Sequence, residues 1–395
     1  MPRKIIHLDL DAFFCAVEEQ RDPTLHRKPF VVGPRPEYRG VVASCSYAAR
    51  RYGIHSAMPM ARALKLCPEL IILSPHFKAY SEASRQVMEY LHTLTYLVEQ
   101  VSIDEAFLDL TDIPEPGEAV ARLMQTYIGV NFKLPCSLGV ATNKLVAKIA
   151  TNVGKAANRS DEPPNAITVV PSGQEAAFLD PLPADALWGV GPKTATRMAK
   201  LNLLTIGDIA RYPEKDLVKN FGKFGHELYL HAHGIDDSPI STSHEVKSIS
   251  QETTYIRDVN DSDTLHRTLF EQSESVGRRL RQAGLSGTTM KIKLRWSDFT
   301  TITRQITLDE PTNQDKVIYQ NACLLLDHAW QLNKPVRLLG VGVSGLGSHA
   351  YQLSLWADGT EKDRRLQEAV DLLRERYGDK TVKRARDLKR DNDKL

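Results

Sequence analysis

Apolar residues recur with two different spacings along the first 170 positions of the chain. Short runs rich in aliphatic and β-branched residues predict strands, and longer segments with apolar residues at every third or fourth position predict helices. Strands and helices alternate here, which favours a sheet covered by helices. The predicted strands are residues 4–10, 29–34, 40–47, 135–141, 166–170 and two within 97–111; the predicted helices are 12–20, 48–53, 58–68, 77–94, 117–129 and 143–153.

The pattern changes at Pro171. Short helical patterns continue to about residue 235, with a Gly-x-Gly-Pro turn between two of them. Residues 236–246, DDSPISTSHEV, have the composition of a linker. Strands and helices then return, with strands predicted at SISQETTY, TTMKIKLRWSDF, TTITRQITL and VRLLGVGVSGL, before a charged tail. The chain is therefore predicted to be a multidomain α+β protein.

Length and composition agree with this division. At about 100–200 residues per domain, the 395 residues predict two to four domains. The content of 42% hydrophobic and 25% charged residues is typical of a globular protein rather than a disordered or fibrous one. A net charge of +2 neither favours nor excludes a polyanionic partner.

The cysteines and the N-terminus favour a reducing compartment. Five widely spaced cysteines form no zinc-binding spacing, and their odd number argues against a disulfide framework. Asp9 and Asp11 interrupt the first apolar run, unlike a signal peptide, and no apolar segment is long enough to span a bilayer. We expect a cytoplasmic protein without a membrane partner.

Two groups of acids interrupt strands that otherwise look buried. In HLDLDAFF (7–14), alternation puts His7, Asp9 and Asp11 on one face, and Asp104 and Glu105 follow in VSIDEAF. A buried carboxylate is strongly unfavourable unless it is paired or bound to a cation, and no basic residue lies between these acids. Mg²⁺ prefers such oxygen ligands, and two ions can activate a hydroxyl and stabilise a leaving pyrophosphate. For Asp9 and Asp11 alone the alternative is a turn or helix cap; the second acidic group favours metal.

Four further segments carry residues suited to phosphate. Tyr47 and Arg50 are three apart on a short helix, so they share a face, with a plain surface pair as the alternative. Lys155, near the end of another helix, is a second candidate, with a solvated lysine as the alternative. GVGPKTA (189–195) has the form of a helix–hairpin–helix turn, whose backbone amides can bind a DNA phosphate; a plain αα-hairpin is the alternative. KIKLRW (291–296) alternates basic and apolar residues, so one strand face could follow a phosphate backbone or simply face solvent.

Taken together, these motifs resemble those of the Y-family translesion DNA polymerases, and among them the bacterial DNA polymerase IV branch. The resemblance runs in order through KIIHLDLDAFFCAVE, GVVASCSYAARRYGIHSAMP, VSIDEAFLDLT, SLGVATNKLVAKIA, LWGVGPKTA, LRWSDFTTITR and VRLLGVGVSGL, which together span about residues 1–350. It implies template-directed, error-prone DNA synthesis on damaged templates by two-metal nucleotidyl transfer, without a proofreading exonuclease.

The resemblance also implies a right-hand architecture with an additional α+β little-finger domain, and a monomer that binds primer–template DNA and a deoxynucleoside triphosphate. The expected parts are a palm (1–18 and 75–170), fingers (19–74), a helical thumb (171–235), a linker (236–246), a little finger (247–349) and a C-terminal tail (350–395).

The resemblance implies a role for each position that matches a functional residue of the family. The expected ligands of two Mg²⁺ ions are Asp9, Asp104, Glu105 and the backbone carbonyl of Leu10, the three acids being the catalytic residues. The expected nucleotide contacts are Phe14, as a steric gate against a 2′-hydroxyl, and Ser44, Tyr47, Arg50 and Lys155. The expected DNA contacts are Gly189, Gly191 and Lys193 on the primer backbone and Arg295 and Arg304 on the template. We expect Asp11 to orient or cap the turn into the first helix, and Phe13 to pack in the core.

Two segments depart from this pattern or add to it. The family usually continues Pro-x-Gly after the lysine, but here the run is KAANRSDEPPNAI, which is longer and more polar. YQLSLW resembles the peptide by which bacterial polymerases dock on a sliding clamp, so a clamp is a candidate partner, with a non-binding amphipathic stretch as the alternative. The expected clamp contacts are Gln352, Leu353, Leu355 and Trp356.

Two other function classes make different predictions. A DNA-binding adaptor that had lost its chemistry would be expected to lack one or more of the acids, whereas all three are present. A nucleotide cyclase with the same palm would need neither the helix–hairpin–helix turn nor a second DNA-binding sheet. A polymerase is therefore the leading hypothesis.

Overall fold

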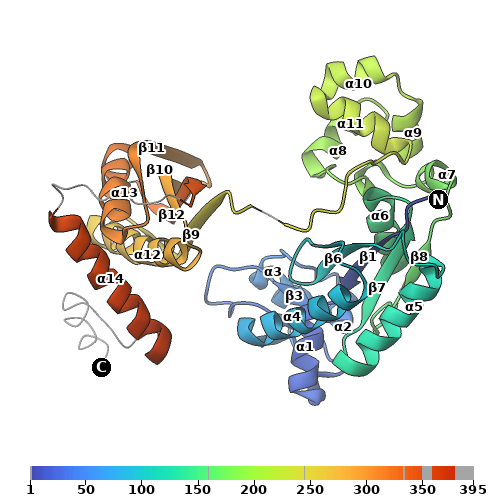
Figure 1. The fold of residues 1–395 in the computed structure, drawn as a ribbon, viewed down its shortest axis with the longest axis horizontal. Helices are drawn as coiled ribbons and strands as arrows, with labels where there is room; N and C mark the ends of the chain where they lie inside the picture. Colours follow the sequence, from blue (N-terminus) through green and yellow to red (C-terminus); the bar gives the residue numbers. More distant parts are fainter. Residues whose placement is uncertain (1, 159, 244, 332–333, 349–357, 379–395) are drawn as a thin grey trace. The chain divides into compact units, whose positions relative to one another are not determined.

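The computed structural model describes residues 2–158, 160–243, 245–331, 334–348 and 358–378, and the side chains of 358–364 are not among them. The chain separates into two compact units, Met1–His244 and Glu245–Leu395, which we describe one at a time (Figure 1). No helix in the described ranges is both long enough and apolar enough to cross a membrane.

A five-stranded sheet organises the first unit, with β1 at its centre (Figure 1). The order is β5-β6-β1-β7-β8; β1 is antiparallel to both of its neighbours, and β7 and β8 are parallel. The strands are β1 (Ile5–Leu10), β5 (Val98–Gln100), β6 (Glu105–Asp109), β7 (Cys136–Ala141) and β8 (Ile167–Val169). Each of them was predicted from its apolar run.

The two faces of β1 pack against different helices, as its alternation predicts. Ile6, Leu8 and Leu10 are buried in a core with helices α4 (Phe77–Leu94) and α5 (Gly117–Tyr127). Ile5 is buried in a second core with helix α6 (Lys144–Ala157). Since His7 and Asp9 alternate with the first set, the acid of β1 lies on the α6 side of the sheet.

A small sheet, in the order β3-β2-β4, lies between α1 and α4 in the sequence. Its strand β4 was not predicted, because its three-residue apolar run gains strand character only by pairing in parallel with β2, a contact distant in sequence. Cys45 of β3 is buried in the core of this region. The elements are α1 (Phe13–Arg21), β2 (Phe30–Val32), β3 (Ser44–Cys45), α2 (Tyr47–Arg50), α3 (Met60–Leu66) and β4 (Ile71–Leu73), with a 3₁₀ turn at Pro23–Leu25.

The short helical patterns after Pro171 are present as helices, and their apolar residues join the core on the α6 side of the sheet. Gly189 has φ +91°, a conformation that favours glycine, at the turn before α8. The helices are α7 (Glu175–Leu179), α8 (Pro192–Ala199), α9 (Ile206–Arg211), α10 (Glu214–Phe221) and α11 (Lys223–Ala232), with a 3₁₀ turn at Ala184–Ala186.

The segment predicted to be a linker is anchored to the first unit over its first half. Lys144 and Glu99 form a buried ion pair with 2.7 Å between Nζ and Oε2, and only 8% and 9% of their side chains are exposed. Glu99 Oε2 also accepts the backbone N–H of Ser241 at 2.7 Å, and Asp236 accepts the N–H of Leu145 at 3.0 Å. The chain is therefore held against α6 and β5 as far as Ser241.

The second unit is a four-stranded antiparallel sheet, in the order β11-β10-β12-β9, with α12 and α13 packed on one face. The guanidinium of Arg281 joins Asp315 of α13 at 2.8 Å and Asp371 of α14 at 2.7 Å. The elements are β9 (Ser248–Val259), α12 (Ser262–Gln282), β10 (Ser286–Trp296), β11 (Thr301–Thr312), α13 (Asp315–Ala329), β12 (Val336–Gly347) and α14 (Asp358–Tyr377).

The buried pair gives a stability prediction. Lys144→Met should lower the free energy of unfolding of the first unit by about 3–5 kcal/mol, because Glu99 would remain buried without its cation. Urea unfolding followed by circular dichroism measures the change. The exposed Lys78→Met in α4 is the matched control, and adding Glu99→Gln to Lys144→Met should recover part of the loss. Equal midpoints for Lys144→Met and Lys78→Met would contradict this account.

Candidate active site

A cavity of about 300 Å³ opens where β1 ends and α1 begins. Its walls come from β1, α1, β3, α2, the turn between β5 and β6, and the last turn of α6. These segments are far apart in the sequence, so the fold alone brings them together. Seven of the residues singled out from the sequence line it: Asp9, Leu10, Phe14, Ser44, Arg50, Asp104 and Lys155.

The three expected metal ligands lie at the same end of two neighbouring strands. Asp9 is directly opposite Glu105 in the β1–β6 register, so both side chains are on one face of the sheet. The N–H of Leu10 donates to the carbonyl of Asp104 at 2.9 Å, and Ser102 Oγ donates to Asp104 Oδ1 at 2.6 Å. The strand ends therefore bring these acids close together, as the sequence predicts.

Each of two acids has a basic partner from α6, which corrects the expectation that they lack one. Lys155 Nζ lies 2.6 Å from Asp9 Oδ1, and Lys148 Nζ contacts Glu105 Oε1. In the described ranges, no three His, Cys, Asp or Glu side chains already converge as a metal site. Three carboxylates and the Leu10 carbonyl are nonetheless the hard oxygen donors that suit Mg²⁺, with the lysine ammonium groups in place as positive charge.

The surroundings shift the pKa values of two of the acids in opposite directions. Burial raises the pKa of Asp9 to about 6, although Lys155 opposes the shift. Burial also acts to raise the pKa of Glu105, but hydrogen bonds from His7 and Lys148 outweigh it and lower that pKa to about 2. Glu105 is therefore held as a carboxylate by the protein itself, whereas Asp9 depends more on a nearby cation.

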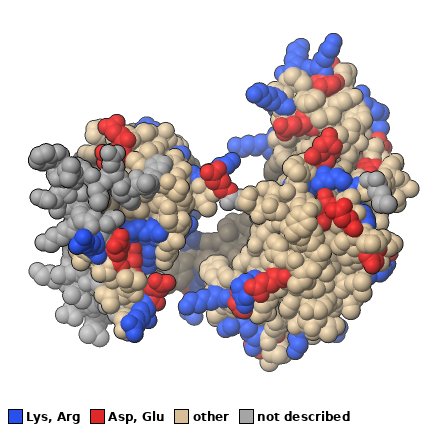
Figure 2. All heavy atoms as spheres, in the orientation of Figure 1, with Lys and Arg blue, Asp and Glu red and all other residues tan. Residues whose placement is uncertain are grey.

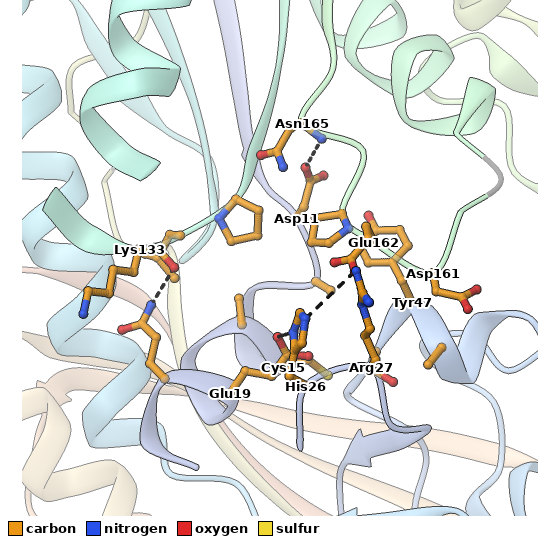
Figure 3. Close-up of a pocket in the computed structure, with 18 of the residues that line it drawn as sticks. Asp11, Cys15, Glu19, His26, Arg27, Tyr47, Lys133, Asp161, Glu162 and Asn165 are labelled. Atoms are coloured by element: carbon orange, nitrogen blue, oxygen red, sulfur yellow. Dashed lines mark hydrogen bonds and ion pairs between the residues drawn. The ribbon is translucent and has the colours of Figure 1, made fainter. Parts of the chain in front are cut away.

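The expected triphosphate contacts are divided between two adjoining cavities. Ser44, Arg50 and Lys155 line the first, and Tyr47 lines a second cavity of about 710 Å³, with Ala12 common to both (Figure 3). The guanidinium of Arg50 lies 4.5 Å from the centre of the Tyr47 ring. The Tyr47 hydroxyl is buried and has no hydrogen-bond partner among the described residues, so a ligand oxygen could satisfy it.

Phe14 and Phe13 have different surroundings. Phe13 is 2% exposed and belongs to the core, whereas the half-buried Phe14 stacks on Tyr80 of α4 with 4.2 Å between ring centres. Tyr80 is fixed in turn, because its hydroxyl donates to Glu18. Sequence reasoning missed Tyr80, since it occupies one of the regular apolar positions of α4.

Asp11 does not cap α1, contrary to the expectation. Ala12 is the N-cap of that helix, with φ 46°, and no side chain caps it. Asp11 is fully buried and accepts hydrogen bonds from Ser137 Oγ at 2.8 Å and from the N–H of Asn165 at 3.2 Å (Figure 3). The ammonium group of Lys155 also lies 3.1 Å from Asp11 Oδ1. The Asp11 carboxylate therefore ties the segment after α6 to the sheet.

That segment is the polar run in which the sequence departs from the expected pattern. Asp161 pairs with Arg51 at 2.6 Å. Glu162 pairs with Arg27 (Figure 3). Both arginines belong to the region of α1, α2 and the small sheet. The run thus links the end of α6 to this region through exposed ion pairs, which stabilise a structure only slightly.

The helix–hairpin–helix residues lie at the start of α8. Gly191 is its N-cap, and Lys193 is exposed in its first turn. Free N–H groups at a helix start can bind a phosphate without reading base sequence. Figure 2 shows basic side chains along the outer edge of the helical segment that carries α8.

The two expected template contacts lie on opposite faces of the second unit's sheet. Arg295 shares its face of β10 with Lys291 and Lys293, and glycines stand opposite these two lysines on β12. Arg304 pairs with the buried Ile292, so it lies on the face against which α12 and α13 pack, although its own side chain on the edge strand β11 is exposed. The basic face therefore includes Arg295 but not Arg304.

The expected clamp contacts, Gln352, Leu353, Leu355 and Trp356, are outside the described residues.

Comparisons with known proteins agree across the length of the chain. Residues 8–152 match the model of the impB/mucB/samB family, and residues 246–355 match the model of that family's C-terminal domain. Residues 185–236 match a model described as the DNA polymerase-iota thumb domain.

Several curated proteins that are similar to this chain are named DNA polymerase IV. A DNA polymerase IV of Desulfatibacillum aliphaticivorans is 40% identical over 96% of each chain. One of Streptococcus mutans is 39% identical over 90% of this chain and 96% of its own. Two similar solved structures, each 25% identical, are a chimera of the Y-family polymerases Dbh and Dpo4, with a TM-score of 0.76, and an insertion ternary complex of Dbh DNA polymerase, with a TM-score of 0.62. They cover 86% and 87% of this chain and 98% of their own.

The contacts of Asp11 predict a structural role. Asp11→Ala should lower the free energy of unfolding by about 1–3 kcal/mol, because a buried hydroxyl and a backbone N–H lose their acceptor. It should also speed limited proteolysis within residues 158–165, while Mn²⁺ binding, measured by calorimetry, changes little. Asp9→Ala is the matched control and should abolish that binding. If Asp11→Ala abolished it as well, Asp11 would be a metal ligand.

Proposed function

Because this chain belongs to the bacterial DNA polymerase IV branch of the Y-family DNA polymerases, and is a DNA-directed DNA polymerase, we propose that it extends primers across damaged template by two-metal nucleotidyl transfer, without a proofreading exonuclease. The cavity at the end of β1 supports this proposal best, since it gathers acids, basic groups and an aromatic ring from six segments. Family membership also disfavours the adaptor and cyclase alternatives.

The parts of the molecule have corresponding roles in the proposal. The five-stranded sheet with its helices is the palm (1–18 and 75–170), the small sheet and its helices are the fingers (19–74), and α7–α11 form the thumb (171–235). The second unit supplies the little finger (247–349) beyond the linker. Primer and template contact the thumb at Gly189, Gly191 and Lys193, and the basic sheet face at Arg295. We propose that the polymerase acts as a monomer, with the segment after residue 350 available to a sliding clamp.

Asp9, Asp104, Glu105 and the Leu10 carbonyl would hold two Mg²⁺ ions. When bound, these ions would supply the charge that lowers the pKa of the primer 3′-hydroxyl and stabilises the departing pyrophosphate. In this proposal Asp9 and Asp104 would contribute oxygens to both ions, and Glu105 would contribute one to the ion that acts on the 3′-hydroxyl. Through the ions that they hold, the carboxylates would help to orient the attacking and leaving oxygens.

The basic residues of the cavity bind the triphosphate. Arg50 offers a planar pair of donors to phosphate oxygens, and the Tyr47 hydroxyl, which has no partner among the described residues, offers another. Lys155 must move its ammonium group from Asp9 to the phosphates when the metal takes its place. Phe14, supported by Tyr80, would lie under the sugar and leave no room for a 2′-hydroxyl.

Removing an acid tests the chemistry. Asp104→Ala or Glu105→Ala should reduce primer extension at least about a thousandfold, as losses of groups that act directly in the transition state do, while DNA binding stays within a few-fold. A gel-based extension assay with a fluorescence-anisotropy DNA titration measures both. The exposed Asp112→Ala is the matched control. Extension that survived both changes would refute the assignment.

The two phenylalanines test the steric gate. Phe14→Ala should raise the rate of ribonucleotide incorporation about tenfold or more relative to deoxynucleotides, because the barrier to the 2′-hydroxyl is removed. Phe13→Ala should instead lower the free energy of unfolding by about 3–5 kcal/mol with little change in sugar selectivity. Tyr80→Leu should relax selectivity partly, since Phe14 loses its support. The reverse behaviour of the two phenylalanine variants would show that the gate is Phe13.

A further inference from the structure

His7 is a fully buried residue at the centre of the palm sheet for which the proposed chemistry has no role. Both of its ring nitrogens are engaged. Nε2 lies 2.6 Å from Glu105 Oε1, and Nδ1 lies 2.8 Å from the hydroxyl oxygen of Thr151 on α6. The imidazole therefore connects an expected metal ligand to a helix on the same side of the sheet.

The contacts fix the direction of these hydrogen bonds. A carboxylate only accepts, so Nε2 must carry the proton that it shares with Glu105. In a neutral imidazole Nδ1 then has a lone pair, which requires the Thr151 hydroxyl to donate. That hydroxyl also lies 3.1 Å from the carbonyl oxygen of Ala147 and 3.3 Å from that of His7, but donating to either would leave Nδ1 facing a lone pair. Thr151 is thus the group that keeps the Nε2 proton directed at Glu105.

A glycine on the adjacent strand makes this contact possible. Gly139 of β7 stands opposite His7 in the register. A Cβ at Gly139 would lie 2.0 Å from the carbonyl oxygen of Ala147 and 2.7 Å from the Thr151 hydroxyl oxygen. Only glycine lets α6 approach closely enough for Thr151 to reach the histidine.

Lys148, nearly one turn before Thr151 on α6, holds the same carboxylate oxygen as His7. Its Nζ contacts Glu105 Oε1 and lies 5.4 Å from the centre of the Trp188 ring. Both partners thus bind Oε1, and the described residues offer Oε2 no hydrogen bond. One oxygen of Glu105 is fixed by the protein, and the other remains for a ligand.

We propose that Thr151 and His7 are positioning residues for metal binding: they hold Glu105 by Oε1 in a single orientation so that Oε2 is available to the divalent ion. This inference rests on the proposed function, because it takes Glu105 to be a metal ligand. A carboxylate oriented in advance binds the ion without first losing its rotational freedom. A buried histidine that merely satisfies its hydrogen bonds in the core would not affect metal affinity.

Mn²⁺ binding by the full-length polymerase tests the proposal. The protein is bound to primer–template DNA with a dideoxy-terminated primer, and free Mn²⁺ is followed by electron paramagnetic resonance. Thr151→Val, which keeps the shape but removes the hydroxyl, should weaken Mn²⁺ binding about tenfold or more. Thr151→Ser, which keeps the hydroxyl, should stay within about threefold of the parent protein.

Three further variants separate positioning from folding. Thr268→Val removes a hydroxyl of similar burial from α12 in the second unit, and it should leave Mn²⁺ affinity unchanged. Should Thr151→Val fail to fold, His7→Gln and His7→Leu replace it: glutamine can still donate to Glu105, so only leucine should weaken binding. With Mg²⁺ as the metal in extension assays, the concentration for half-maximal rate should rise while KM for the nucleotide stays constant.

Two results would overturn the inference, and one would point to a different fault. Parent-like Mn²⁺ affinity in Thr151→Val, or in His7→Leu where that variant replaces it, would make the network a structural feature only. Equal weakening by Thr151→Ser and Thr151→Val would do the same. Glu105→Ala is measured alongside; if it bound Mn²⁺ like the parent protein, the ligand assignment of the proposed function would be wrong, whatever the Thr151 variants showed.

Discussion

The free-energy penalty of burying carboxylates is the constraint on which the rest of this structure depends. Asp9, Asp11, Glu99 and Glu105 all lie on or beside the palm sheet with little access to water. An unpaired charge in such a place is strongly unfavourable, so each acid requires a donor or a cation. The partners of all four come in large part from one helix, α6, and its geometry therefore determines how the site is built.

The residues of α6 that meet these acids or His7 are spaced at i, i+4, i+7 and i+11, which places them along one face of the helix. Lys144 pairs with Glu99 on β5, and Lys148 pairs with Glu105 on β6. Thr151 reaches His7, and Lys155 reaches Asp9, both on β1. Over about 16 Å of helix, the stripe thus crosses three adjacent strands in order. The same helix anchors the linker at its start and faces the cavity at the end of β1 with its last turn.

The sequence predicted what local patterns can encode. Apolar spacing located most strands and helices, and the D-x-D and D-E motifs located Asp9 and Asp104, which line the cavity, and Glu105 next to Asp104. It did not predict which lysines pair with them, because pairing depends on how α6 lies across the sheet. One signal for this pairing was present in the sequence. Lys144, Lys148 and Lys155 are spaced so that they lie on one face of the predicted helix, the face that packs toward the palm sheet. Strand β4 and the opposite faces of Arg295 and Arg304 depend on strand pairing and register, which are long-range properties.

The lysine–acid pairs also couple the two ligands of the proposed reaction. Lys155 neutralises Asp9 in this structure, and the same ammonium group is the expected partner of the triphosphate. If this ammonium group moves to the phosphates while no cation replaces it, Asp9 keeps its raised pKa and has only more distant charges around it. A metal ion held by Asp9 without nucleotide would compete with this ammonium group, whose other acidic partner among the described residues is Asp11 at 3.1 Å. Arrival of nucleotide and metal together avoids both states, so charge balance at the end of β1 favours their joint binding.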